Sequence, residues 1–405
     1  MKAYERLLKY VKFNTQSSDT SGSHPSTECQ LELAGALRDE LISLGCENVY
    51  LDDKCYLYAK LPAKAGYENK TKIGFIAHMD TAPDFSGEGV NPVIHENYDG
   101  GIITLSDSGR ELDPKIFPHL TTLKGRTLIT TDGKTLLGAD DKAGVSEIMT
   151  LVEELAKGDT PHGDVLIAFT PDEEIGEGAD FFDVKRFGAD FAYTVDGGEE
   201  GSLEYENFNA SSASFKVKGF NVHPGSAKDV MINASLVAME INGLLPSLET
   251  PANTEGYEGF FHLISMEGNV ESASLSYIVR DHDENKLQEK KDTLALIEKR
   301  MNEKYGVGTV TLEIKDSYKN MKEMIIPHMH LIENAKNASL ASGVTPTVMP
   351  IRGGTDGARL SFMGLPCPNL GTGGYAFHGP FEHITKEGMD TVVKILTEIV
   401  KAYAE

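Results

Sequence analysis

Apolar runs alternate with helical patterns along the first half of the chain. Short segments rich in β-branched and aromatic residues, typical of buried strands, occupy residues 72–78, 164–174 and 191–198. Between them, residues 144–158 carry apolar side chains at helical spacing and end at a Lys-Gly pair. This order of strand, helix and strand predicts an α/β fold with a mixed, largely parallel sheet and helices on both faces. Residues 95–131 interrupt the order with frequent Gly and Pro, which indicates a long insertion or β-excursion.

The pattern changes in the second half of the chain. Alternating strands are interleaved with two helices in the order βαββαβ, which is the order of a ferredoxin-like sheet. The expected elements are strand 212–219, helix 233–245, strands 259–268 and 272–281, helix 284–306 and strand 308–316. They predict a small α+β domain over residues 209–319, inserted into a larger domain made of residues 1–208 and 320–405.

Three elements after the insertion resume the larger domain. Residues 326–343 and 385–405 are predicted helices, and residues 366–371 are a short apolar strand. At the other end of the chain, residues 1–16 lack the apolar core of a signal peptide and predict an amphipathic helix. No apolar run is long enough to span a bilayer, and we expect no membrane partner.

The composition limits the partners of the chain. At 405 residues the chain is too long for one ordinary core, which favours two domains. Its 62 acidic and 38 basic residues give a formal net charge of −24, which argues against nucleic acid and anionic membrane surfaces as partners. Excess acid promotes solubility, and it also suits an amine-bearing ligand or a carboxylate-rich metal site.

The cysteines indicate the compartment and the type of metal ligand. Four cysteines are scattered at positions 29, 46, 55 and 367 without C-x-x-C spacing. This favours free thiols in a reducing cytoplasm. Any metal ion would therefore be held by histidines and carboxylates.

A histidine ends the first buried strand, and a carboxylate follows two residues later. His78 offers a ring nitrogen to a metal ion, and Asp80 can fix the other ring nitrogen. Alone, a histidine near a strand end is more often structural. The pattern gains weight because acidic residues or histidines follow other strands of the chain in the same way.

Two acidic pairs repeat this pattern. Asp140 and Asp141 stand just before a predicted helix, where an aspartate can also serve as a helix cap. Glu173 and Glu174 follow a buried strand, and one carboxylate can ligate a cation while the other holds a water. The alternative for this second pair is a solvated acidic loop.

Single residues complete the set of candidates. Asp196 ends a strand before two glycines, where an ordinary Asp-Gly turn is the alternative. His378 and His383 lie in or beside a glycine-rich run, so a loop can bring one of them to a site while the other is structural.

The candidates can converge because ligands of open α/β sheets bind beyond the carboxyl ends of the strands. Nitrogen and oxygen ligands without a thiolate suit two divalent ions that share a carboxylate. Imidazole with carboxylate favours Zn²⁺, with Co²⁺ or Mn²⁺ as substitutes. The expected ligands are His78, Asp140, Glu174, Asp196 and His378.

The chain resembles the M20 family of co-catalytic zinc peptidases in five segments that occur in the family's order: AHMDTAPDFSG, LLGADDKAG, TPDEEIGEGA, TVDGG and FHGPFEHI. The similarity covers essentially the whole chain and is greatest with the tripeptide aminopeptidases of the family. It implies a zinc exopeptidase-like fold whose inserted domain is a lid or dimerisation domain. It also implies that His78 and Asp196 bind one zinc ion, that Glu174 and His378 bind the other, and that Asp140 bridges them.

The resemblance implies further roles for residues that do not bind metal. Asp80 would orient the first histidine, and Glu173 would be the general base. The family commonly has a cis peptide bond after the bridging aspartate, here between Asp140 and Asp141. One small departure is Ala77, where many members have Gly.

Residues in and near the inserted domain are candidates for substrate binding. His223 and Arg280 can donate to an oxyanion; a turn residue and an ion pair with neighbouring aspartates are the alternatives. We expect Arg280 or Arg352 to bind the substrate carboxylate bidentately, and Asn253 to recognise a polar end of the peptide. In dimeric family members the equivalent of His223 comes from the partner subunit's lid, so the resemblance allows a homodimer through this domain. A lid on two connections also suggests hinge closure over substrate.

The resemblance implies metal-dependent hydrolysis of the N-terminal peptide bond of tripeptides, with release of the N-terminal amino acid. The alternative within the family is another amidohydrolase: a dipeptidase, a carboxypeptidase or a deacylase of N-acyl amino acids. A non-catalytic metal-binding protein is disfavoured, because it would have no need of Glu173 beside Glu174.

Overall fold

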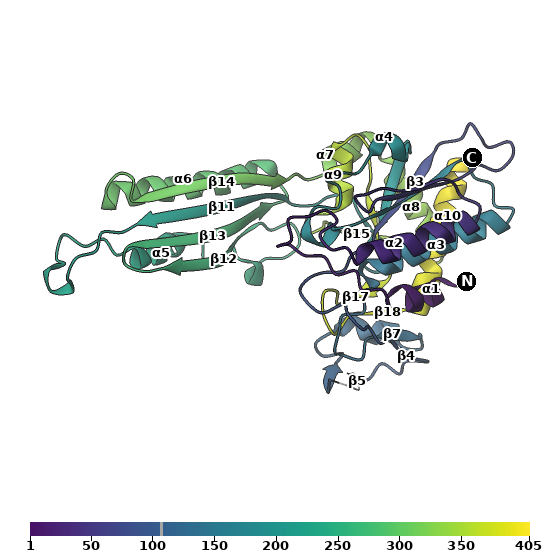
Figure 1. Cartoon of the computed structure of the whole chain (residues 1–405), viewed down its shortest axis with the longest axis horizontal. Helices are drawn as coiled ribbons and strands as arrows, with labels where there is room; N and C mark the ends of the chain where they lie inside the picture. The colour runs from purple at the N-terminus through teal and green to yellow at the C-terminus, as the bar shows by residue number, and fades with distance from the viewer. Residues whose placement is uncertain (106–107) are drawn as a thin grey trace. The chain divides into compact units, whose positions relative to one another are not determined.

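The computed structural model describes residues 1–105 and 108–405, which form two compact units (Figure 1). Unit 1 consists of Met1–Tyr205, Glu323–Met349 and Thr355–Glu405, and unit 2 consists of Glu206–Lys322 and Pro350–Gly354. The sequence prediction placed the insertion at residues 209–319 and assigned residues 350–354, which include Arg352, to the larger domain.

Unit 1 is built around an eight-stranded mixed sheet. In spatial order its strands are β1 (Glu47–Leu51), β2 (Leu57–Leu61), β8 (Val165–Thr170), β3 (Ile73–His78), β9 (Phe191–Val195), β16 (Asn369–Leu370), β10 (Ser202–Glu204) and β15 (Thr347–Val348). The pairs β8–β3, β3–β9, β9–β16 and β10–β15 are parallel. The pairs β1–β2, β2–β8 and β16–β10 are antiparallel. The predicted mixed, largely parallel sheet is confirmed.

Helices cover both faces of this sheet, which explains why its central strands are continuously apolar. Every residue of β3 and β8 is buried. On one face, α4 and α9 pack against an apolar cluster that contains Tyr58, Ile76 and Leu166. On the other, α3 packs against β3 and contacts α1 and α10. The helices of unit 1 are α1 (Ala3–Tyr10), α2 (Gln30–Ser43), α3 (Ala139–Lys157), α4 (Val184–Phe187), α8 (His330–Ala341), α9 (Asp356–Phe362) and α10 (Lys386–Ala404). A short helix, α7 (Lys322–Ile325), begins at the last residue of the Glu206–Lys322 segment of unit 2.

The predicted β-excursion forms a small sheet with residues from the end of the chain. The antiparallel sheet has the order β17 (Gly374–Tyr375), β18 (His383–Thr385), β7 (Leu128–Thr130) and β4 (Val93–His95). A hairpin of β5 (Ile103–Leu105) and β6 (Arg110–Leu112) belongs to the same region. The loop between β17 and β18 carries His378. Across residues 1–105 and 108–405, no helix has the length and apolar character needed to cross a membrane.

Unit 2 is a four-stranded antiparallel sheet with two helices on it. The strand order is β12 (Phe260–Gly268), β13 (Ser272–Asp281), β11 (Asn209–Lys218) and β14 (Val310–Tyr318). The helices α5 (Ala234–Gly243) and α6 (Glu284–Tyr305) cover a core that includes Phe215, Leu275 and Leu294 (Figure 1, green). Since the element order is βαββαβ, the predicted ferredoxin-like arrangement is confirmed.

Asparagines join the two segments with which the main part of unit 2 begins and ends. The Asn207 side-chain amide donates to the Lys319 carbonyl at 3.1 Å, and its oxygen accepts from the Met321 N–H at 2.7 Å. Asn209 accepts from the Asn320 N–H at 2.9 Å. These bonds tie the entering and leaving chains together at one end of the sheet.

Candidate active site

An aspartate lies between two imidazoles at the edge of the unit 1 sheet. The Nε2 atom of His78 is 3.0 Å from Asp140 Oδ1 and 3.8 Å from Asp196 Oδ1. The Nε2 atom of His378 is 3.4 Å from Asp140 Oδ2 and 2.9 Å from Glu174 Oε2. Each oxygen of Asp140 therefore faces a different histidine. The structure brings together all five residues that the sequence predicted as metal ligands.

The sheet topology explains this convergence. His78 is the last residue of β3, Asp196 directly follows β9, and Glu174 lies in a short 3₁₀ turn after β8. These three strands are parallel neighbours, so their carboxyl ends meet at one edge. The first turn of α3 adds Asp140, and the loop between β17 and β18 adds His378.

Asp80 contacts both His78 and the loop that carries Glu173 and Glu174. Its Oδ1 atom lies 3.3 Å from the Nδ1 atom of His78 and accepts from the Glu173 N–H at 3.0 Å. Its Oδ2 atom accepts from the Glu174 N–H at 3.2 Å. Asp80 is fully buried, and its two oxygens are already engaged. This geometry suits a positioning role and leaves metal contact to the neighbouring side chains.

The peptide bond between Asp140 and Asp141 is cis, as the family resemblance implied. Asp141 is fully buried, and its carboxylate accepts from the backbone N–H groups of His78 at 3.1 Å and of Gly144 at 3.2 Å. Gly144 is needed where α3 approaches β9, because a Cβ at this position would lie 1.9 Å from the Val195 carbonyl oxygen. Asp141 therefore joins the start of α3 to the end of β3.

The electrostatics of the site reflect a large excess of buried acid. Burial raises the pKa of Glu174 to about 7 and that of Asp196 to about 6. Burial also favours a higher pKa for Asp140, but hydrogen bonds to the two histidines outweigh it and hold that pKa below its ordinary value. The pKa of His78 is raised well above its ordinary value, because hydrogen bonds to carboxylates outweigh the opposing effect of burial. Hydrogen bonds to Asp140 and Glu174 raise the pKa of His378 to about 11.

This donor set fits metal ions. Potential ligand atoms of His78, Asp140 and Glu174 lie within 4.8 Å of one another, and so do those of His78, Asp141 and Asp196. The Oε1 atom of Glu174 is buried and has no hydrogen-bond partner among the described residues. Imidazole and carboxylate groups that share a buried, strongly acidic site are the ligands of divalent transition metals.

The two arginines predicted to bind the substrate carboxylate differ in how many of their side-chain nitrogens already donate hydrogen bonds. Arg352 donates from Nη1 to the Gly256 and Glu258 carbonyls at 2.7 and 3.0 Å, and from Nη2 to Thr254. Arg280, on β13, donates from Nη1 to the Arg352 carbonyl at 3.1 Å, while its buried Nε has no partner among the described residues. Both arginines belong to unit 2.

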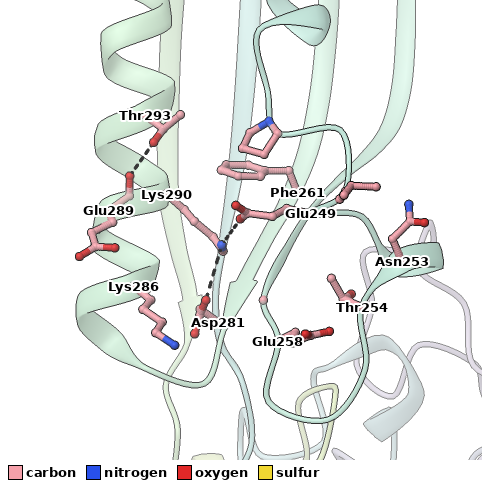
Figure 2. Close-up of a pocket in the computed structure, with 13 residues that line it drawn as sticks. Glu249, Asn253, Thr254, Glu258, Phe261, Asp281, Lys286, Glu289, Lys290 and Thr293 are labelled. Carbon is pink, nitrogen blue, oxygen red and sulfur yellow. Dashed lines mark hydrogen bonds and ion pairs between the residues drawn. The ribbon is translucent and has the colours of Figure 1, made fainter.

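The other two predicted substrate residues also lie in unit 2 and are exposed. His223 precedes a 3₁₀ turn, and its Nδ1 atom accepts from the Gly225 N–H at 3.1 Å. Asn253 lines a groove beside α6, in which Lys290 pairs with Glu249 and Asp281 (Figure 2). The Asn253 amide donates to the Thr250 hydroxyl at 2.7 Å.

Buried carboxylates near the site that were not singled out by the sequence analysis include Asp172, Glu382 and Asp356, and Asp356 lines a small cavity with His78, Glu173 and Asp196. Glu382 accepts three backbone N–H groups from the loop before Asp140. Asp172 accepts from the N–H and hydroxyl of Ser26, which ties the acidic loop to the N-terminal region. The neighbouring His383 is buried, and its Nε2 atom is 2.9 Å from that of His119, so it is a structural residue.

A cluster of histidines and carboxylates at the carboxyl ends of parallel strands is the arrangement of a metal-dependent hydrolase. The comparisons with known proteins agree. Residues 130–402 match the model of Peptidase family M20/M25/M40. A relative named Peptidase T, from Clostridium perfringens (strain ATCC 13124), is 56% identical over 405 residues, which is 100% of this chain and 99% of the relative. The chain therefore belongs to the M20/M25/M40 family of peptidases.

Solved structures show the same fold. The aminopeptidase PepT from Bacillus cereus ATCC 10987 aligns with a TM-score of 0.79 at 22% identity, covering 100% of this chain and 98% of that one. A tripeptidase from Staphylococcus aureus subsp. aureus Mu50 aligns with a TM-score of 0.78 at 20% identity, with the same coverage.

Proposed function

We propose that this peptidase is a two-zinc tripeptide aminopeptidase that releases the N-terminal residue of its substrate. The observation that carries the proposal is the placement of Asp140 between His78 and His378, each facing a different carboxylate oxygen. The full-length similarity to Peptidase T supports the choice of a tripeptide substrate.

The residues that would hold the ions follow from the donor set. His78 and Asp196 would bind one ion, Glu174 and His378 the other, and Asp140 both. Bound ions of this kind lower the pKa of a shared water molecule and polarise the scissile carbonyl. Co²⁺ or Mn²⁺ can substitute for Zn²⁺ with such ligands.

Glu173 is the general base of this proposal. Its backbone is fixed by Asp80, so its side chain is held beside the metal ligands. Burial and the charge of Asp196 raise the pKa of Glu173 well above its ordinary value, which makes the carboxylate a better proton acceptor. It would take the proton of the attacking water and deliver it to the leaving amine.

Replacing Glu173 by Gln tests this assignment. We expect kcat to fall by about 10²- to 10⁴-fold, the usual contribution of a general base, while two zinc ions stay bound. Glu177→Gln, an exposed change on the same loop, is the control and should keep wild-type activity. A Glu173→Gln enzyme within tenfold of wild type would exclude Glu173 as the base.

Substrate class is tested by turnover of di-, tri- and tetrapeptides with free and blocked amines, after chelation and zinc restoration. A tripeptide aminopeptidase prefers the tripeptide with a free amine. Preference for an acylated amino acid or a dipeptide would favour the alternative, another amidohydrolase of the family.

Arg280 is the better of the two candidates for the substrate carboxylate, because each Nη atom of Arg352 already donates to two acceptors, whereas the buried Nε of Arg280 has no partner among the described residues. We expect Arg280→Lys to raise KM for a tripeptide and Arg352→Lys to change it less, since lysine lacks the bidentate fork. An unchanged KM in both variants would contradict this role. His223 and Asn253 remain candidates for contacts to the oxyanion and to a polar end of the peptide.

Unit 2 also offers a surface for a homodimer. Its edge strand β12 exposes Ile264 and Met266, and α5 exposes Leu236 and Met239. An unpaired strand edge beside exposed apolar side chains suits pairing with a second copy. Light scattering of the wild type and of a Leu236→Glu, Met239→Glu variant tests this, since the variant should be monomeric. The four free cysteines support a cytoplasmic location.

A further inference from the structure

Glu382 is a buried carboxylate that binds backbone far from it in the sequence. Its Oε2 atom accepts from the N–H groups of Leu137 and Gly138 at 2.7 and 2.8 Å. Its Oε1 atom accepts from the N–H of Asp140 at 2.9 Å. Glu382 is 1% exposed, so all three bonds are shielded from water.

These bonds fix the irregular turn with which α3 begins. The residue before α3, Gly138, has a left-handed φ of 78°, and Asp140 and Asp141 within α3 have non-helical backbone angles. Backbone N–H groups left without acceptors in a buried turn are costly, and the Glu382 carboxylate satisfies three of them. The loop that presents Asp140 is thus fixed by a residue 242 positions later.

The same carboxylate belongs to the loop that presents His378. Glu382 lies four residues after His378, just before β18. The side chain of His378 is 45% exposed, and the groups that face its ring nitrogens are Asp84 and the proposed ligands Asp140 and Glu174. By contrast, His78 is buried at the end of a central strand.

We propose that Glu382 is a positioning residue that joins the Asp140 and His378 loops into one unit and so sets the ligand spacing of the second metal ion. The inference rests on the proposed two-metal site. Groups that orient metal ligands usually contribute about 10- to 100-fold to metal affinity. Loss of Glu382 should therefore lower the affinity for the ion whose ligands come from both loops. The affinity for the ion at His78 and Asp196 should change less.

Glu382→Gln is the direct test, because it keeps the size of the side chain but presents an NH₂ group to at least one of the three N–H donors. Glu387→Gln is the matched control, since Glu387 accepts from the Thr127 N–H at 2.9 Å but binds no loop that carries a proposed ligand. Affinities are measured by competition of Zn²⁺ with a chromogenic chelator, and the geometry by the visible absorption of Co²⁺-loaded protein. Thermal unfolding of the metal-free variants reports on folding.

We expect the wild type and Glu387→Gln to bind two ions. Glu382→Gln should bind its second ion about 10- to 100-fold more weakly, with an altered Co²⁺ spectrum for that ion only. Two ions bound with wild-type affinities and spectrum would overturn the role of Glu382, as would equal weakening of both ions or the same loss in the control. A wild type that binds a single ion would instead refute the two-metal site.

Discussion

The substitution Asp80→Asn separates orienting a metal ligand from binding the metal. Asp80 is fully buried and accepts from the N–H groups of Glu173 and Glu174, while its Oδ1 atom also faces the Nδ1 atom of His78. An asparagine keeps the size of the side chain but has only one acceptor oxygen. One of the two loop N–H groups therefore loses its acceptor and meets an NH₂ group.

The structure sets the size of the effect. A hydrogen bond to a charged group contributes about 1.5 to 3 kcal/mol, and 1.36 kcal/mol of activation free energy is a factor of ten in rate. If the lost bond displaces Glu173 from the attacking water, kcat should fall by about 10- to 150-fold. The proposed ligands of the first ion, His78 and Asp196, remain, so the zinc content should stay close to that of the wild type.

The assay is steady-state hydrolysis of a tripeptide by zinc-saturated enzyme, with metal content measured on the same sample. Asp52→Asn is a control outside the site, where Oδ1 of Asp52 accepts from the N–H groups of both Lys54 and Tyr56 at 2.9 and 2.8 Å. Since the asparagine oxygen can accept both of these N–H groups, the control should keep the kcat of the wild type. If Asp80→Asn loses one ion completely, Asp80 is itself a ligand; if kcat stays within twofold of wild type, the positioning role is wrong.

Three other substitutions and one ligand experiment give further predictions. Burial lowers the pKa of His383 to about 4. The unfolded chain takes up this proton near pH 6.5, so the free energy of unfolding should fall as pH drops from about 6.5 to about 4. Urea unfolding of His383→Gln should show a smaller fall in this free energy over the same pH range. Asp172→Ala leaves two buried donors of Ser26 unpaired and should cost about 2 to 4 kcal/mol in chemical denaturation; an unchanged midpoint would contradict this. Gly144→Ala places a Cβ 1.9 Å from the Val195 carbonyl and should lower Tm clearly, unlike Gly35→Ala on the open surface of α2. Chelation should also lower Tm, and Zn²⁺ at about 100 times its Kd should restore about 2.7 kcal/mol.

The sequence predicted the elements whose apolar pattern is long or periodic. β3, β8, β9, α3, α10 and all six elements of unit 2 lie where predicted, because each has enough residues to show its period. Strands β10 and β15 have three and two residues, too few for a period, and only tertiary pairing defines them. The short strand β16 lies within the predicted strand 366–371. The segment Pro350–Gly354 was likewise not predicted as part of unit 2, because it joins that unit from a distant part of the chain.

Some residues of the candidate site were also predictable from the sequence, and others were not. His78, Glu174 and Asp196 directly follow apolar strands, so the rule that parallel strands end together was enough to group them. Glu382 gave no such signal, because its partners are backbone N–H groups more than 240 residues away. The saturation of Arg352 was hidden for the same reason, since its acceptors are carbonyls of the segment 254–258.

The proposed ligands are spread from residue 78 to residue 378 of a chain of 405. Synthesis proceeds from the N-terminus, and domains fold as they emerge. A chain still on the ribosome therefore holds four of the five ligands well before the last, which comes only with the loop before β18. A peptidase arranged in this way can complete its proposed set of metal ligands only after residue 378 has been added.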